Sequence, residues 1–126
     1  MRRVTVLDLD SAKRALAEGE ARGEQVLLVS PRDGVAQAGA AFFVALAREL
    51  GHDVVIDASG YPGYALEALR LGARTVLFRG DPLLRRRLDR LARRQGGRVL
   101  GRLPAAASSR VASGGVRGLP RTPEDG

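Results

Sequence analysis

Short apolar segments alternate with segments of helical period along the first hundred residues, and this alternation constrains the fold more than any other feature. Strands are predicted at Val4–Leu9, Gln25–Ser30, Asp53–Ala58 and Arg74–Arg79, with a shorter fifth strand at Arg98–Gly101. Near-continuous apolar strands such as VTVLDL and DVVIDA are typical of a sheet that has helices on both faces. The sequence therefore predicts an α/β fold.

The intervals between these strands carry apolar residues at helical spacing. Four helices are predicted. The first runs from Ala12 to Ala21 with Ser11 as N-cap and an end near Gly23, the second from Phe42 to Leu50 with a stop at Gly51, and the third from Tyr64 to Leu71 with a stop at Gly72. The fourth starts at Pro82 after an Asp81 cap, and Leu84, Leu88 and Leu91 form its buried stripe. The order βαβαβαβαβ predicts right-handed crossovers and a small, mainly parallel sheet of four to five strands, either flavodoxin-like or half-TIM-barrel-like.

Periodicity stops after the fifth predicted strand. From Arg102 the chain mixes Pro, Gly, Ser, Ala and Arg, and it has little apolar surface to offset the cost of ordering. We expect a single α/β domain at residues 1–101 and a disordered Arg/Gly/Pro/Ser-rich tail at residues 102–126.

Composition excludes several kinds of chemistry. The chain has no cysteine, which rules out disulfides and thiolate sites, and Lys13 and His52 are its only lysine and histidine. Acidic residues precede any long apolar run, so no signal peptide is predicted, and the apolar stretch at residues 34–47 is too short to span a bilayer. We expect a cytoplasmic protein with no membrane partner.

Polar residues and glycines gather where the predicted strands end. In parallel α/β sheets and barrels, ligands bind at the carboxyl ends of the strands. The candidate ligand-binding residues are Asp8, Ser30, Asp57, Ser59, Gly60, Gly63 and Arg79. The competing interpretation is that short polar residues at these positions only cap the next helix, as Asp10, Ser11 and Asp81 could do.

The most distinctive segment is DASGYPGYALEALRLGARTVLFRG, residues 57–80. Its Gly/Pro turn opens a helix whose free N–H groups could hold a phosphate or carboxylate. The segment resembles the βα units of phosphate-binding TIM-barrel enzymes of the keto-deoxy-phosphogluconate aldolase type. That resemblance implies a Schiff-base lysine on the VLFRG strand, where this chain has Arg79. Because arginine stays protonated, an aldolase- or lyase-like enzyme here would act without a Schiff base, through Asp57 and Arg79.

Asp8, Asp10 and Asp57 also resemble the acidic pocket of a response-regulator receiver, which implies a magnesium-dependent phosphoacceptor. The receiver pattern then requires Ser or Thr at the fourth strand and Lys at the fifth, and this chain has neither. Neither GxGxxG nor GxxxxGK[ST] occurs. No cofactor and no metal are predicted.

Arginine is concentrated in the last predicted helix and beyond it. With 21 basic and 14 acidic residues the chain carries a net charge of +7. The candidate partner-binding residues are Arg85, Arg86, Arg87, Arg90 and Arg94. They could bind nucleic acid or an acidic protein, or they could form an ordinary solvated face, because the segment after Leu83 has no stacking aromatic residue.

Three functions are therefore ranked. The first is a non-catalytic or regulatory domain that binds a small anionic ligand at the carboxyl ends of its strands. The second is an interaction module that uses the Arg-rich helix and tail, and the third is the aldolase- or lyase-like enzyme.

The candidates for a homo-oligomer face are Phe42, Phe43, Tyr61 and Tyr64, although core packing is preferred for the two phenylalanines. His52 lies at the amino end of the third strand and is expected to be exposed or at a helix terminus.

Overall fold

The computed structural model describes residues 1–105. The predicted tail falls largely on residues 106–126, which lie outside the described part. The strands are β1 (Arg2–Thr5), β2 (Val26–Val29), β3 (Val54–Asp57), β4 (Thr75–Leu77) and β5 (Arg98–Leu100), and the helices are α1 (Leu9–Arg22), α2 (Gly34–Ala38), α3 (Ala40–Leu50), α4 (Pro62–Arg70) and α5 (Pro82–Arg93).

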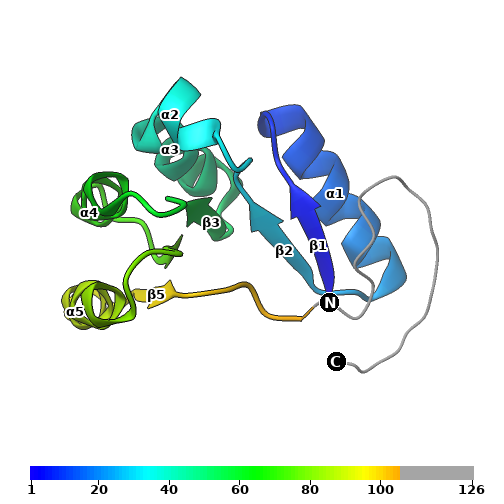
Figure 1. Ribbon diagram of the computed structural model, residues 1–126. Coiled ribbons are helices and arrows are strands. Elements are labelled where there is room, and N and C mark those ends of the chain that lie inside the picture. The colour runs from blue at the N-terminus through cyan, green and yellow to red at the C-terminus, as the bar shows by residue number, and fades with distance from the viewer. Residues whose placement is uncertain (106–126) are drawn as a thin grey trace.

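All strand pairings are parallel, and the strands lie in the order β1-β2-β3-β4-β5. The predicted α/β fold with one parallel sheet is thus confirmed. Each strand pairs with the next strand along the chain, so the sheet has no point where the strand order reverses, as a flavodoxin-like sheet would have. The sheet curls, and the helices follow its outside in an arc (Figure 1). Of the two predicted layouts, this is the half-barrel.

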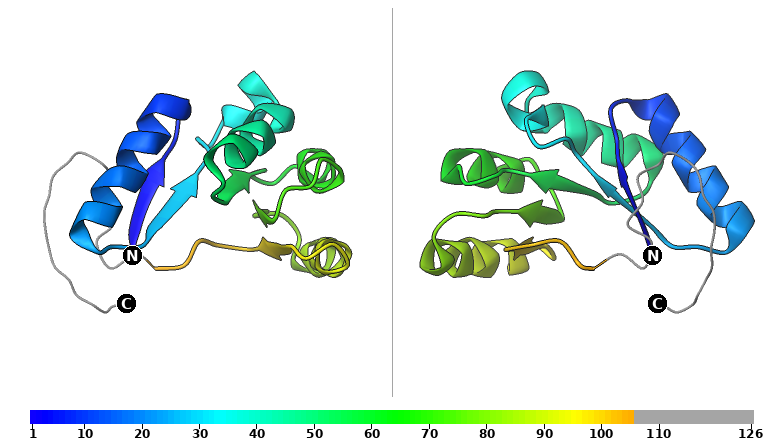
Figure 2. Two further views of the ribbon diagram at one scale, coloured as in Figure 1. Left: turned by 180° about the vertical axis from the view of Figure 1, so that it is seen from behind. Right: turned by 45° about the vertical axis from the view of Figure 1, so that its right-hand side comes forward.

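The helices cover one face of the sheet, not both as expected. The outer core joins Leu28, Ile56 and Phe78 of the sheet region to Ala15 of α1 and Val44 of α3. The inner face has a separate cluster of Val29, Val55 and Leu77, against which Leu27, Leu100 and Leu103 pack. The two further views show the helices outside the curled sheet from both directions (Figure 2). Curling therefore buries the inner face without a second layer of helices.

Several predicted boundaries are corrected. Strand β1 ends at Thr5, and Asp8, not Ser11, is the N-cap of α1. The short helix α2 lies between β2 and α3, where no helix was predicted. Leu91 is 39 % exposed and Phe42 is 41 % exposed, whereas Ala92 and Phe43 take the buried positions. In α5 and in α3, the residue that follows the predicted core residue faces the core instead.

Two helix ends follow the sequence closely. Gly23 ends α1 and Gly51 ends α3, both in the left-handed conformation with φ of 67° and 63°. A residue with a Cβ is strained in that conformation, so glycine is favoured there. Asp81 caps α5, with Pro82 in its first turn, as predicted. Within residues 1–105 no helix is both long and apolar enough to cross a membrane.

Candidate functional site

Asp57 and Arg79 meet at the carboxyl end of the sheet. Asp57 is the last residue of β3, and Arg79 follows β4, the neighbouring strand. Nη1 of Arg79 lies 2.9 Å from Oδ1 of Asp57 and 3.1 Å from Oδ2. The Asp57 side chain is 4 % exposed and that of Arg79 is 35 % exposed. The carboxylate is therefore buried and compensated, while part of the guanidinium reaches the surface.

Ser30 and Ser59 extend the hydrogen-bond network around Asp57, Ser30 at its backbone and Ser59 at its carboxylate. The Asp57 N–H donates to Oγ of Ser30 at 2.9 Å, and the Ser59 N–H donates to Oδ1 of Asp57 at 2.8 Å. The Arg79 N–H donates to the Ser59 carbonyl at 2.6 Å, and Oγ of Ser59 donates to the Arg32 carbonyl at 3.3 Å. Four predicted ligand-binding residues thus lie together at the ends of β2, β3 and β4.

Ser59 has an unusual backbone conformation, with φ of 53°. Among residues 1–105 it is the one non-glycine residue with positive φ. Such a conformation costs of order 1 kcal/mol or more and is enriched at ligand-binding sites. It turns the chain sharply between Asp57 and Gly60, so the Ser59 N–H points back at the carboxylate while the loop leads into α4.

Gly60 and Gly63 border an open approach to the N-terminus of α4. The N-cap residue, Tyr61, makes no side-chain capping bond, and Pro62 has no N–H to be satisfied. A Cβ built on either glycine meets no heavy atom within 4 Å. The first-turn N–H groups of α4 have no acceptor within their own helix, and residues 60–63 are all exposed. These groups form the part of the site that an acceptor could reach.

Asp8 does not join this network. Its carboxylate accepts the Ser11 N–H at 2.8 Å, and Oγ of Ser11 accepts the Asp8 N–H, which together form a capping box. The Ser11 N–H, followed by its hydroxyl, lowers the pKa of Asp8 below its ordinary value. Asp81 likewise accepts the Leu84 N–H at 3.0 Å. Both aspartates act as helix caps.

The acidic pocket implied by the receiver resemblance is not formed. No group of three or more histidine or acidic residues that could hold a metal ion occurs in the described part of the chain. Asp57 binds Arg79, and Asp8 caps α1. Asp8 and Asp57 therefore play separate roles, and Asp10 lies in the first turn of α1.

The predicted arginines of α5 divide into two groups. Arg86, Arg87, Arg90 and Arg94 are exposed, and none of them forms an ion pair within residues 1–105. Arg85 is half-buried instead, and its Nη1 donates to the Val99 carbonyl at 3.4 Å. Arg85 therefore supports the contact between α5 and β5 and does not belong to the exposed stripe.

The aromatic residues predicted for an oligomer face are only partly available. Phe43 is buried, with its ring edge-on to Phe42 at 5.0 Å between ring centres. Tyr61 is 62 % exposed and packs edge-on against Tyr64, whose side chain contacts the outer core. Tyr61 is thus the aromatic residue next to the open N-terminus of α4.

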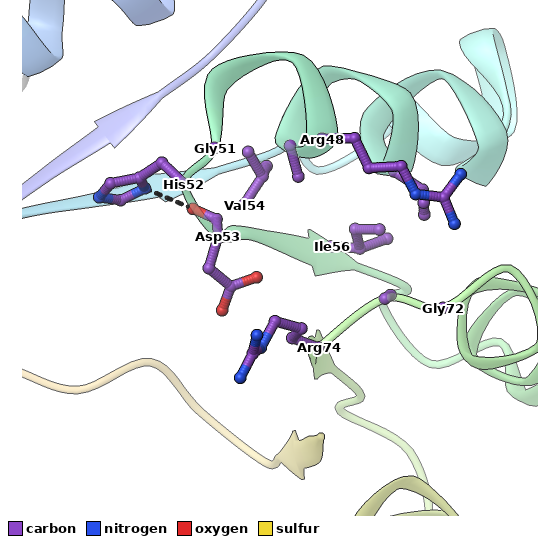
Figure 3. A pocket seen from close by; sticks show the side chains of 11 residues that line it. Arg48, Gly51, His52, Asp53, Val54, Ile56, Gly72 and Arg74 are labelled. Carbon is purple, nitrogen blue, oxygen red and sulfur yellow. Dashed lines mark hydrogen bonds between the residues drawn. The ribbon is translucent and has the colours of Figure 1, made fainter. Parts of the chain in front are cut away.

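A groove that the sequence did not indicate lies at the other end of the sheet. It occupies about 610 Å³ between α3, β3 and the turn from α4 to β4. We call it the amino-end groove; Arg48, His52, Asp53 and Arg74 carry its polar groups (Figure 3). His52 is half-buried here, and its Nδ1 lies 2.8 Å from the Asp53 carbonyl oxygen. Asp53 directly precedes β3, and Arg74 directly precedes β4, the neighbouring strand. A charged residue just before each of two neighbouring strands is the sequence signal that could have indicated the groove.

No protein-family model, curated protein or solved structure matches the chain. The case for a function therefore depends on the geometry of the two ends of the sheet and of α5.

Proposed function

We propose that the domain is non-catalytic or regulatory and binds a small anion, bearing a phosphate or carboxylate group, at the carboxyl ends of its strands. The observation that carries this proposal is the partly exposed side chain of Arg79, which Asp57 fixes at the loop that leads into the uncapped N-terminus of α4. Only Nη1 of Arg79 is bound to the carboxylate. Its remaining N–H groups stay available to an anion in bidentate geometry.

The helix terminus adds a second set of donors to the proposed site. The free N–H groups at the start of α4 carry the positive end of the helix dipole, which favours an anion. Gly60 and Gly63 leave these groups accessible. Asp8 and Asp81 cap α1 and α5, and Asp57 is paired with Arg79, so none of these three carboxylates occupies the first-turn N–H groups of α4.

The same geometry gives less support to the aldolase- or lyase-like alternative. Asp57 is the carboxylate that such an enzyme would use, yet it is nearly fully buried. Both of its oxygens accept hydrogen bonds from Arg79, and one also accepts the Ser59 N–H. A general base must reach the proton that it removes, and this carboxylate is already committed.

Thermal unfolding with inorganic phosphate, glycerol 3-phosphate and citrate tests the proposal. A ligand that binds only the native state raises its stability, by about 2.7 kcal/mol at a hundredfold excess over Kd. We expect one of these anions to raise Tm, and we expect Gly60→Val to abolish that rise by blocking the approach. Arg94→Gln removes one positive charge elsewhere and should leave the rise intact. If no anion raises Tm, or if Gly60→Val leaves the rise unchanged, the proposal is wrong.

A second candidate function is supported by the exposed stripe of α5, formed by Arg86, Arg87, Arg90 and Arg94. These four guanidinium groups, on α5 and its C-cap, form no ion pair within residues 1–105, and together they create a positive surface suited to nucleic acid or an acidic protein. Binding of a labelled single-stranded RNA should weaken steeply with salt, and Arg86→Gln/Arg90→Gln should weaken it further. RNA binding that is insensitive to salt would contradict an electrostatic role for the exposed stripe.

A further inference from the structure

We propose that the amino-end groove binds a small organic carboxylate with an apolar body. The groove lies at the opposite ends of the strands from Asp57 and Arg79, so this proposal does not depend on the anion site described above. It depends on three features of the groove: the nature of its floor, the balance of its charges, and the way Arg48 is fixed.

The floor of the groove is apolar. It is formed by side chains of α3, of β3 and of the turn before β4: Val44, Ala47, Val54, Ile56 and Ala73. Val44, Val54, Ile56 and Ala73 are at most 7 % exposed, and Ala47 is half-buried, so a hydrocarbon ligand would cover the small apolar surface that they leave in contact with water. Burial of such surface contributes roughly 25 cal/mol per Å². A volume of about 610 Å³ lies within the range of small-molecule sites.

The charged groups around this floor are mainly cationic. Arg48 and Arg74 contribute two positive charges, and Asp53 contributes one negative charge. Oδ2 of Asp53 accepts a hydrogen bond of 2.6 Å from Oγ1 of Thr75, which holds that carboxylate toward β4. Within residues 1–105, Arg74 makes no side-chain hydrogen bond or ion pair. Its guanidinium is therefore a free cation beside an apolar surface.

Arg48 is held in place at the other side of the groove. Its Nη2 donates to the Leu71 carbonyl at 2.9 Å, which joins α3 to the end of α4. The same nitrogen lies 3.3 Å from the position that a Cβ of Gly72 would occupy. Figure 3 shows Arg48 and Arg74 on different elements at opposite sides of Ile56, with their guanidinium groups pointing away from each other. A carboxylate could contact either guanidinium while its hydrocarbon part lies on the floor.

The test is a titration of the amide NMR spectrum with sodium octanoate. We expect saturable shifts at His52, Val54 and Ala73, around the groove. Inorganic phosphate supplies charge without an apolar body, and 1-octanol supplies the apolar body without charge. Each should bind at these residues at least tenfold more weakly than octanoate. Octanoate shifts that are absent, or that occur instead at Gly60 and Gly63, overturn the proposal.

Two substitutions test separately how much the cationic side chain and the apolar floor of the groove contribute to octanoate binding. Arg74→Gln removes the free cation at an exposed position and should weaken octanoate binding about tenfold or more. Ala47→Leu places a larger side chain in the groove and should also abolish the shifts, while the rest of the spectrum shows that the fold is retained. Arg22→Gln, at an exposed position at the end of α1, is the matched control and should leave the affinity unchanged. Octanoate binding that survives both groove substitutions overturns the proposal.

Discussion

Arg3 and Pro104 join the first strand to the segment that follows the last strand. Nη2 of Arg3 donates to the Pro104 carbonyl at 2.8 Å, across 101 positions of sequence. Between β5 and this bond the chain places Leu103 against the inner cluster of Val29, Val55 and Leu77. The two edge strands of the curled sheet, β1 and β5, are thus linked through residues 101–104. This segment helps to bury the inner face of the sheet, which no helix covers.

Leu103→Ala should therefore destabilise the domain. The side chain is half-buried, so we expect a loss of about 1–2 kcal/mol, below the 2–5 kcal/mol of a fully buried leucine. Urea unfolding followed by circular dichroism measures the change. Arg102→Ala alters an exposed neighbour and should change the free energy of unfolding by less than about 0.5 kcal/mol. Equal effects of the two substitutions would show that residues 102–105 do not support the inner cluster.

Removal of Arg79 should cost more stability than removal of both partners of its ion pair. Arg79→Gln leaves the buried Asp57 carboxylate without its cation, at a cost of about 1–3 kcal/mol. Asp57→Asn/Arg79→Gln replaces the pair with neutral groups that can still hydrogen-bond, and we expect it to recover part of that loss. A double-mutant cycle measured by urea unfolding gives the coupling. Strictly additive single effects would mean that the two side chains do not interact.

The contact between Asp57 and Arg79 follows from their places in the sequence. Each comes at the end of an apolar strand, and the two strands are consecutive in a predicted parallel sheet, so their side chains converge at the same end. The stops at Gly23 and Gly51 were also predictable, because a left-handed residue at a helix end favours glycine. These features depend on local sequence and on the direction of neighbouring strands.

Other features depend on information that local patterns do not contain. A run such as VVI, residues 54–56, is apolar on both faces, and it does not reveal whether helices or the curl of the sheet cover the second face. The role of Asp8 was concealed by the apolar run through Leu9, although its spacing to Ser11 is that of a capping pair. Arg48 lines the same groove as Asp53 and Arg74 only because of how α3 packs against β3 and the end of α4, and no spacing in the sequence encodes that packing.

The contribution of Asp89 to stability should depend on pH. Partial burial raises the pKa of this carboxyl, but the Val99 N–H and the Arg93 side chain lower it more, so the net shift is downward from 3.8. A lowered native pKa means that the stabilisation is fully present above pH 3.8 and is lost as the pH falls through the native value. The free energy of unfolding of Asp89→Asn should therefore lie below that of the wild type at pH 6, with a smaller difference at pH 2.5. A difference that does not change with pH would contradict this assignment.

Gly97 occupies a position where any Cβ would collide with the backbone of the neighbouring strand. A Cβ there would lie 2.6 Å from the Arg74 carbonyl oxygen. That oxygen accepts the Arg98 N–H at 2.7 Å, a hydrogen bond that joins β5 to the start of β4. Gly97→Ala must displace this carbonyl or the turn that carries Gly97, and we expect a loss of about 1–3 kcal/mol, as for other overpacked sites.

Gly60→Ala is the matched control for Gly97→Ala, because a Cβ at Gly60 meets nothing within 4 Å. Urea unfolding of the two variants compares the same chemical change in crowded and in open surroundings. Hydrogen exchange of the Arg98 amide gives an independent measure, because a displaced carbonyl should expose that N–H to solvent. We expect Gly97→Ala to accelerate this exchange at least tenfold and Gly60→Ala to leave it unchanged. If both variants unfold at the same urea concentration, β5 does not depend on the close approach of Gly97 to Arg74.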